Sequence, residues 1–201
     1  MSKETSAAAQ PKAKVELDVQ FTVKLTATLL GICAVVALLL GAVNSVTKPI
    51  IEEIQAEKTA AAMSQVLPAD EYQKVETSHA NVTALYRAVS GGEQIGYVAE
   101  VTSSGFGGAL SMVVGVDMDG AVTGVSVTDN SETANIGTKV VNDQAVLDRF
   151  IGMSHEDGEI TVNSGSNRFD GISGATVSSK GVTAGVNTAL SAVAEQKGGE
   201  A

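Results

Sequence analysis

A long apolar run near the N-terminus is the strongest feature of the hydrophobic pattern. No charged residue lies between the flanking Lys24 and Lys48. At about 1.5 Å rise per residue, a helix over residues 25–47 spans about 35 Å, compared with about 30 Å for the hydrocarbon core of a bilayer. A cleavable signal peptide is the main alternative, because Ala42 and Ser45 are small, but its apolar region is typically only about 7–15 residues long. We therefore expect a retained transmembrane helix.

Apolar residues recur at helical spacing after this run, with Glu and Lys residues between them. They are Ile50, Ile51, Ile54, Met63, Val66 and Leu67. Pro49 suits the first turn of a helix, so we predict a juxtamembrane helix that ends near Pro68. This helix is either a stalk or the first helix of a globular domain. The predicted division is a cytoplasmic tail at 1–24, the transmembrane helix at 25–47, a juxtamembrane helix and linker at 48–80 and a domain at 81–201.

Between residues 82 and 128 the hydrophobic pattern changes to a period of two, which is typical of strands. Leu110, Met112, Val114 and Val116 alternate with small or polar residues, and Asp119-Gly120 and Gly91-Gly92 are turn signals. The predicted strands are Thr83–Val89, Gln94–Thr102, Leu110–Val116 and Val122–Val127. Sequential strands with short turns indicate an antiparallel meander.

Helical patterns return toward the C-terminus. We predict a helix over Lys139–Phe150, a short strand over Glu159–Val162 and a last helix over Ser178–Ala194. The inward-facing residues are predicted to be Val140, Leu147 and Ile151 in the first helix, and Val182, Val186, Leu190 and Val193 in the last. This order of elements predicts an α+β domain, with an antiparallel sheet flanked by helices.

The distribution of charged residues predicts how the protein is oriented in the membrane and which partners it does not bind. Four lysines precede the apolar run, at positions 3, 12, 14 and 24, so the positive-inside rule predicts a cytoplasmic N-terminus and a domain on the outer face of the cytoplasmic membrane. From residue 49 onward, eight Lys or Arg stand against 20 Asp or Glu, a balance of −12. A domain with this net negative charge repels nucleic acid and anionic lipid headgroups.

Metal-based redox chemistry has few candidate ligands in this chain. Cys33, the only cysteine, lies inside the apolar run, and His79 and His155 stand apart from any metal-ligand spacing. Thiolate-bound iron–sulfur clusters need several cysteines, so we expect no metal site. If the chain carries electrons, an organic cofactor must hold them.

The stretch from Asp170 to Ser179 places Thr176 among small residues just before the last helix. Free N–H groups and the positive end of the helix dipole favour a phosphate at such a position. Gly174 and Ala175 add almost no side-chain bulk, so a large ligand could approach the backbone closely. The alternative is a simple helix cap, since Ser and Thr are common there. Asp170 fits an Asx-turn that holds the loop.

These ten residues resemble the flavinylation motif of the FMN-binding domain family, with matches at Asp170, Ser173, Gly174, Ala175 and Thr176. The resemblance implies FMN joined through its phosphate to the Thr176 hydroxyl as a phosphoester, delivered from FAD by a separate, Mg²⁺-dependent flavin transferase. Ser173, Gly174 and Ala175 would then give that enzyme access and fit the product. Ser179 supplies a further hydroxyl downstream.

Two upstream segments extend the resemblance. Gly105-Phe106-Gly107-Gly108 is too glycine-rich for a strand interior and predicts a loop or bulge, either a plain turn or a close approach to the flavin ring, with Phe106 and Gly107 at the ring. It lacks the setting of a dinucleotide fingerprint. Ser131-Glu132-Thr133 begins a polar loop that runs to Gly137, where Glu132 and Thr133 either cap the next helix or hydrogen-bond the flavin. Many relatives carry Pro-Gly-Leu where this chain has Ala134, Asn135 and Ile136.

Within that family the architecture is most similar to the G subunit of the Rnf electron-transport complex. The resemblance implies a single-pass, membrane-anchored electron carrier without catalytic residues or NAD binding of its own, in a complex that couples ferredoxin and NAD to cation movement. Its expected partners are the other membrane and peripheral subunits, membrane lipid and the flavin transferase. Two alternatives stay open: the equivalent C subunit of the Na⁺-translocating NADH:quinone reductase, and a non-redox extracytoplasmic binding or sensory module.

Overall fold

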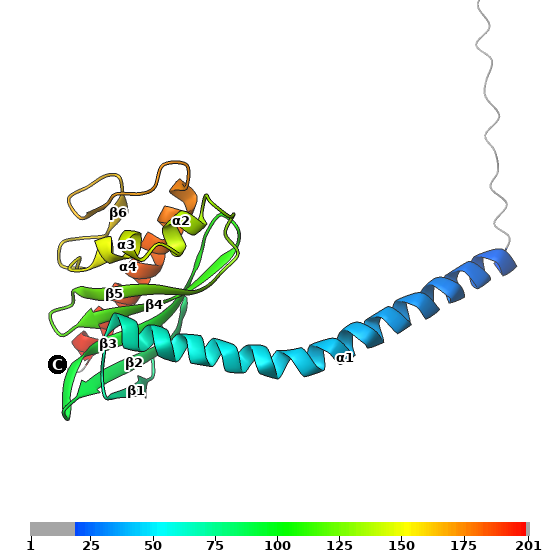
Figure 1. Ribbon diagram of the computed structural model, residues 1–201, viewed down its shortest axis with the longest axis horizontal. Helices are drawn as coiled ribbons and strands as arrows, with labels where there is room; N and C mark the ends of the chain where they lie inside the picture. The colour runs from blue at the N-terminus through cyan, green and yellow to red at the C-terminus, as the bar shows by residue number, and fades with distance from the viewer. Residues whose placement is uncertain (1–18, 200–201) are drawn as a thin grey trace, which may run out of the picture. The chain divides into compact units, whose positions relative to one another are not determined.

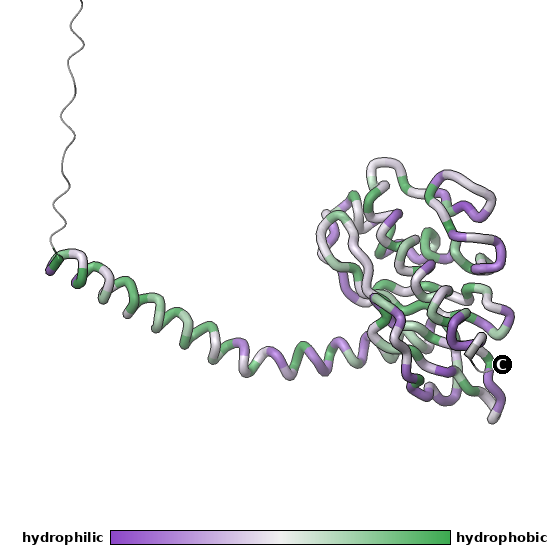
Figure 2. The backbone as a smooth tube through the Cα atoms, turned by 180° about the vertical axis from the view of Figure 1, so that it is seen from behind, coloured by the Kyte–Doolittle hydropathy of each residue, from purple (hydrophilic) through white to green (hydrophobic). Residues whose placement is uncertain are grey.

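The computed structural model describes residues 19–199 and divides the chain into two compact units, Met1–Ile51 and Glu52–Ala201. Helix α1 (Val19–Val66) begins in the first unit and ends in the second. Among the described residues, α1 is the one helix long and apolar enough to cross a membrane. Residues 25–47 of this helix carry no charged side chain and are mostly green in Figure 2, as expected for a helix in contact with lipid.

The separate helix that we predicted to begin at Pro49 is instead part of α1, which continues through this proline. Proline removes one N–H donor and the i→i−4 hydrogen bond that it would make. A helix of 48 residues keeps its remaining hydrogen bonds on both sides of that gap. The helix ends at Val66, close to the predicted end near Pro68.

Five strands form one antiparallel sheet in the order of the sequence (Figure 1). The strands are β1 (Glu71–Val75), β2 (Val82–Ser90), β3 (Glu93–Ser104), β4 (Ala109–Asp117) and β5 (Val122–Asn130). Strands β2 to β5 confirm the predicted meander. Strand β1 was not predicted, because its five residues include only Tyr72 and Val75 as large apolar side chains.

One face of the sheet is covered by α4 (Thr176–Gly199). The predicted apolar stripe of this helix is buried, together with Leu110, Met112, Val114 and Val116 of β4. Gly181 of α4 lies so close to the end of β3 that an added Cβ would lie 2.6 Å from the Ser104 carbonyl oxygen. The start of α4 is therefore held directly against the loop between β3 and β4.

The helix predicted over residues 139–150 is broken into three short pieces. They are α2 (Thr138–Val141), α3 (Gln144–Leu147) and the 3₁₀ helix η1 (Asp148–Phe150). Asp143 causes the break between α2 and α3, since its backbone is extended (φ −96°, ψ 105°) and its carboxylate caps α3 by accepting the Ala145 N–H. Val140 and Leu147 are buried as predicted, but Ile151 lies beyond η1 and is half exposed, which corrects that prediction.

The other face of the sheet receives the last turn of α1. Met63 and Val66 pack with residues of β2, β3 and β4. Gly115 and Gly124 face each other in β4 and β5, and an added Cβ at either would lie 2.9 Å or less from a Val66 backbone atom. These glycines therefore leave the space into which the end of α1 packs.

The Tyr86 side chain lies on this same face. Burial and the neighbouring Glu100 carboxylate raise the pKa of Tyr86 to about 12, so its phenol stays protonated.

A two-stranded parallel ladder, β6 (Thr161–Val162) and β7 (Arg168–Phe169), precedes the loop that leads to α4. Only the end of the strand predicted over residues 159–162 forms. The buried ring of Phe169 stacks on that of Phe150, with centroids 4.1 Å apart. This stack attaches the ladder to the helical layer and fixes where the following loop begins.

Candidate functional site

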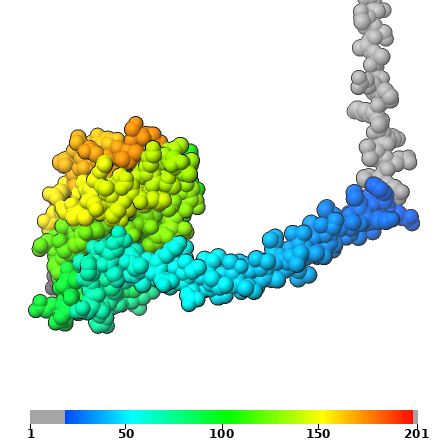
Figure 3. Space-filling model, in the orientation of Figure 1, coloured from blue at the N-terminus to red at the C-terminus, as the bar shows by residue number. Residues whose placement is uncertain are grey.

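Three segments that are far apart in the sequence meet at one cleft of about 330 Å³. They are the β3–β4 loop, the segment between β5 and α2, and the start of α4. Figure 3 shows the yellow-green surface near α2 beside the orange surface that leads into α4. The lining residues are Phe106, Glu132, Thr133, Ile136, Gly137, Gly174, Ala175, Thr176, Val177 and Ser178. The volume is in the range of about 300–1,000 Å³ that is typical of small-ligand sites.

Thr176 is the first residue of α4, and its side chain is exposed at the cleft. The Ala175 N–H donates to the Ile172 carbonyl, and the Ser179 N–H donates to the Ala175 carbonyl. Between them, the N–H groups of residues 176–178 have no acceptor within the part of the chain that the structure describes. The first N–H groups of a helix lack intrahelical partners. They leave three donors beside the Thr176 hydroxyl, an arrangement suited to an anion.

The rim of the cleft is apolar and open to solvent. Phe106 is 70% exposed, and Ile136 and Val177 are each 50% exposed. Residues 52–199 contain six exposed large apolar side chains, and these three all belong to the cleft. An exposed apolar cluster around polar donors is typical of a binding site for a partly apolar ligand. Four lining residues were not predicted as site residues, namely Ile136, Gly137, Val177 and Ser178. Val177 and Ser178 directly follow Thr176, and the other two lie in the predicted polar loop.

Glu132 joins the three segments from inside the cleft wall. The side chain is 9% exposed. Its Oε1 atom accepts the N–H groups of Phe106 (2.8 Å) and Gly107 (3.3 Å), and its Oε2 atom accepts the hydroxyl of Ser178 (2.7 Å). The predicted contact of Glu132 and Thr133 with a flavin stays a prediction.

Glycines allow these segments to approach so closely. An added Cβ at Gly107 would lie 1.9 Å from the Ser131 carbonyl oxygen, and one at Gly137 would lie 2.8 Å from Ser178 Oγ of α4. Gly174 is different, since nothing lies within 4 Å of its Cβ position but its φ is +82°. Gly107 and Gly137 are required for space, whereas Gly174 is required for its backbone conformation.

The segment that departs from the Pro-Gly-Leu of the resembled family keeps a tight turn. The Ile136 N–H donates to the Thr133 carbonyl at 3.2 Å, which closes a four-residue turn. Asn135, in the third position of the turn, has φ +61°. Type II turns favour Pro in the second position and Gly or Asn in the third, where φ is positive. Ala134 and Asn135 therefore preserve the kind of turn that Pro-Gly would make.

Several predicted site residues lie outside the lining of the cleft. The Asp170 carboxylate forms an exposed ion pair with Arg168 at 2.9 Å, while the Asp170 carbonyl accepts from Arg149. Ser179 is fully buried, and its Oγ atom accepts the Ile172 N–H at 3.2 Å. Ser173 is exposed but does not line the cleft. In the structure, Asp170 and Ser179 hold the loop before Thr176.

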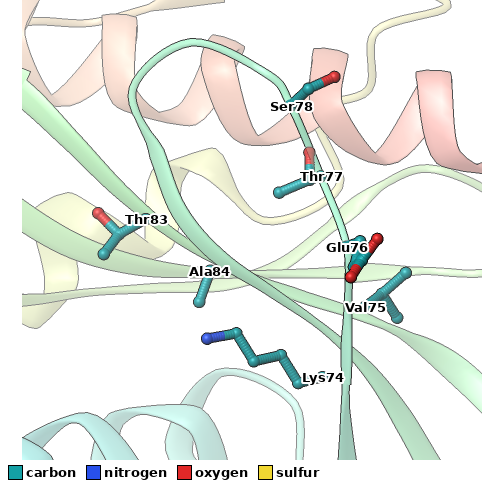
Figure 4. Close-up of a pocket in the computed structure, with 7 residues that line it drawn as sticks. All are labelled: Lys74, Val75, Glu76, Thr77, Ser78, Thr83 and Ala84. Atoms are coloured by element: carbon teal, nitrogen blue, oxygen red, sulfur yellow. The ribbon is translucent and has the colours of Figure 1, made fainter.

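A larger groove of about 710 Å³ lies elsewhere, along the end of β1, the following loop and the start of β2 (Figure 4). Its lining residues are Lys74, Val75, Glu76, Thr77, Ser78, Thr83 and Ala84. The Thr77 hydroxyl already accepts the His79 N–H at 3.3 Å. No cluster of metal-ligating side chains occurs in this groove, in the cleft or elsewhere in residues 19–199.

The fold and the cleft define an α+β ligand-binding domain that follows an apolar helix. Residues 105–191 match the family model of the FMN-binding domain, a segment that runs from the β3–β4 loop into α4. All ten residues that line the cleft fall within this segment.

Similar proteins cover almost the whole chain. The G subunit of the Na(+)-translocating ferredoxin:NAD(+) oxidoreductase complex of Acetobacterium woodii is 32% identical over 90% of this chain and 96% of its own length. The G subunit of the ion-translocating oxidoreductase complex of Methanosarcina acetivorans is 31% identical over 87% and 96%, respectively. A crystal structure of the C subunit of Na(+)-translocating NADH-quinone reductase from Parabacteroides distasonis aligns with 54% of this chain and 59% of that chain, at 24% identity and a TM-score of 0.46. The chain belongs to the family of G subunits of ion-translocating oxidoreductase complexes.

Proposed function

We propose that this protein is a membrane-anchored flavoprotein subunit that relays electrons through FMN bound covalently to Thr176. The observation that carries the proposal is the meeting of the Thr176 hydroxyl, the first N–H groups of α4 and an exposed apolar rim at one cleft. The match to the FMN-binding domain and the names of the relatives support the cofactor and the class of complex.

The residues of the cleft fit FMN. The N–H groups of residues 176–178 would bind the phosphate at the end of α4, where the helix dipole also favours negative charge. Phe106, Ile136 and Val177 would cover part of the ring system and keep water from it. When bound, FMN supplies the electron-carrying chemistry, and the protein supplies binding, orientation and electrostatics.

The proposed linkage needs a second protein. The Thr176 oxygen forms a bond to the phosphorus of the FMN half of FAD, the bond to the AMP half breaks, AMP leaves and the hydroxyl proton is released. A threonine hydroxyl is a weak nucleophile unless a base or a metal activates it. No residue that lines the cleft is a Lys, His or Cys, and both oxygens of its one carboxylate, Glu132, already accept hydrogen bonds from the protein. The activation is therefore assigned to a flavin transferase.

In the proposed arrangement, α1 anchors the protein as a single span with the N-terminus in the cytoplasm. The length and composition of α1 and the four lysines before residue 25 support this orientation. The FMN-binding domain then lies on the outer face of the cytoplasmic membrane. A reporter fused to the C-terminus should be active only outside the cytoplasm, and activity in the cytoplasm would contradict the orientation.

The electron-transfer partners are proposed to be the other membrane and peripheral subunits of an Rnf-type complex that couples ferredoxin and NAD to cation movement. Because the protein holds only the flavin in this proposal, reductive titration of the loaded subunit should bleach only flavin absorption bands. Rapid direct reduction of the isolated subunit by NADH would contradict a relay role and indicate a self-contained reductase.

The experiment that tests the proposal is the intact mass of the full chain, expressed with and without a flavin transferase. The expected gain is the mass of FMN less one water, and only with the transferase. The Thr176→Ser variant is the matched control, since it keeps a hydroxyl at this position and should retain some flavin. No mass gain in the wild-type protein would favour the alternative, a non-redox binding or sensory module.

A further inference from the structure

The Glu132 carboxylate is bound on both oxygens by groups of the protein itself. Oε1 accepts two N–H groups of the β3–β4 loop, and Oε2 accepts the hydroxyl of Ser178 in the first turn of α4. Both oxygens also lie against glycine backbone, because an added Cβ would lie 2.0 Å from Oε1 at Gly105 and 2.0 Å from Oε2 at Gly137. Little of either oxygen is left for a ligand.

These hydrogen bonds connect the two sides of the cleft. The Phe106 and Gly107 N–H groups belong to the loop that carries the most exposed aromatic ring of the rim. Ser178 lies two residues after Thr176, so its hydrogen bond fixes the α4 side. Hydrogen bonds to an ionised carboxylate are about twice as strong as neutral ones. One side chain therefore links the backbone of Phe106 and Gly107 to the first turn of α4, in addition to the direct contact of Gly181 with the end of β3.

We infer that Glu132 is a positioning residue of the cofactor cleft, which acts through the β3–β4 loop and Ser178 and not by contact with the cofactor. The inference rests on the proposed function, because the cleft is taken to bind FMN. Glu132 is thereby assigned to the protein framework, while Phe106, Ile136 and Val177 would contact the ring and the N–H groups of α4 would bind the phosphate.

Two substitutions of Glu132 distinguish the effect of side-chain length from the effect of its negative charge. Glu132→Gln keeps the length of the side chain and one acceptor oxygen, which can still accept the Phe106 and Gly107 N–H groups. The Ser178 hydroxyl can rotate to accept from the new amide. Glu132→Asp keeps the charge but is one methylene shorter, so it cannot reach both sides of the cleft. A positioning role requires length, whereas a role of the negative charge at the flavin requires a carboxylate.

The test combines two measurements on the full chain in detergent. The first is amide hydrogen exchange of Phe106 and Gly107 in the flavin-free protein, which reports whether their N–H groups are still hydrogen-bonded to Glu132 when no cofactor is present. The second is the initial rate of FMN attachment with transferase and FAD. We expect Glu132→Gln to retain protection at both amides and an attachment rate within about twofold of wild type. Glu132→Asp should lose protection and attach FMN about tenfold more slowly, a change equivalent to about 1.4 kcal/mol.

Ser178→Ala is the second variant, because it removes one donor and leaves the carboxylate in place. It should slow attachment by roughly threefold, less than Glu132→Asp does, since two of the three hydrogen bonds remain. An attachment rate of Glu132→Asp equal to that of wild type overturns the inference. A Glu132→Gln rate as low as that of Glu132→Asp, with both amides still protected, also overturns it and indicates direct contact with the flavin. A wild-type chain that never gains FMN overturns the proposed function itself.

Discussion

Two of the hollows of the domain differ in a way that volume alone does not reveal. The groove beside β1 and β2 measures about 710 Å³, and the cleft at the start of α4 measures about 330 Å³. The residues of the larger groove all come from positions 74–84, so one continuous segment of the chain forms it. The smaller cleft assembles residues from positions 106–178. It contains an exposed hydroxyl, an apolar rim and helix N–H groups that have no acceptor among the described residues.

Between these two hollows, the proposed site is the one in which distant segments converge, although it is the smaller of the two. A groove between a strand and its own following loop arises from local geometry. By contrast, the cleft requires glycine contacts at Gly107 and Gly137 and the Glu132 hydrogen bonds, each of which joins separate elements.

The largest expected effect is on covalent flavin attachment, and a pair of threonine variants, one in each hollow, tests it. Thr176→Ala should abolish covalent flavin, because no other hydroxyl in the cleft is both exposed and at the start of α4. Thr77→Ala, the same change in the larger groove, should leave attachment unchanged. In-gel fluorescence after denaturation measures both, since only covalent flavin remains with the protein. Equal fluorescence from the two variants would remove the distinction between the hollows.

Gly107→Ala should have the next largest effect. The new methyl group would lie 1.9 Å from the Ser131 carbonyl oxygen, and overpacking of this kind typically costs about 1–3 kcal/mol. Denaturant unfolding measures the loss. Gly198→Ala is the control, because nothing lies within 4 Å of its Cβ position in α4 and alanine is favourable in helices. A stable Gly107→Ala protein with normal attachment would show that the close approach is dispensable.

Asn135 tests the turn on the rim with a smaller effect. Asn135→Val should destabilise the domain by about 1–2 kcal/mol, since a β-branched residue is disfavoured at φ +61°. Asn135→Gly should be neutral within about 0.5 kcal/mol, because glycine adopts positive φ freely. Thermal unfolding of the two variants gives the comparison. If valine were tolerated as well as glycine, the turn would have to differ from the one described.

The apolar rim is expected to contribute the smallest effect. Ile136 and Ile151 are both 50% exposed, but only Ile136 lines the cleft. In a Thr176→Ala background, Ile136→Ser should raise the Kd for free FMN by roughly fivefold, as expected from covering half an isoleucine side chain. Ile151→Ser should not change this Kd. Fluorescence titration with FMN measures both, and equal shifts would remove the rim from the binding site.

Local patterns were sufficient to predict much of this fold. The alternation of Leu110, Met112, Val114 and Val116 predicted β4 and its buried face, and the stripe from Val182 to Val193 predicted the buried side of α4. Thr176 could be placed at a helix N-terminus because small residues precede an amphipathic run. These features depend on neighbours in the sequence.

The features that escaped prediction depend on contacts between distant residues. Strand β1 is short and polar and exists through pairing with β2. The sequence pattern does not distinguish Asp143 from the other residues of the predicted helix, but in the structure its carboxylate caps α3. The side chain of Ser179 turns to Ile172 rather than into the cleft. No local pattern indicates that Glu132 binds the backbone of Phe106 and Gly107. Tertiary structure alone determines these partners.

Peptide mapping by mass spectrometry of the wild-type chain, expressed with a flavin transferase, tests the central claim most directly. The account predicts one modified peptide, which contains Thr176 and carries FMN as a phosphoester, while the peptide that contains Thr77 is unmodified. FMN on a different residue, or no modified peptide although the transferase is active on another substrate, would contradict the claim that the cleft at the start of α4 is the cofactor site.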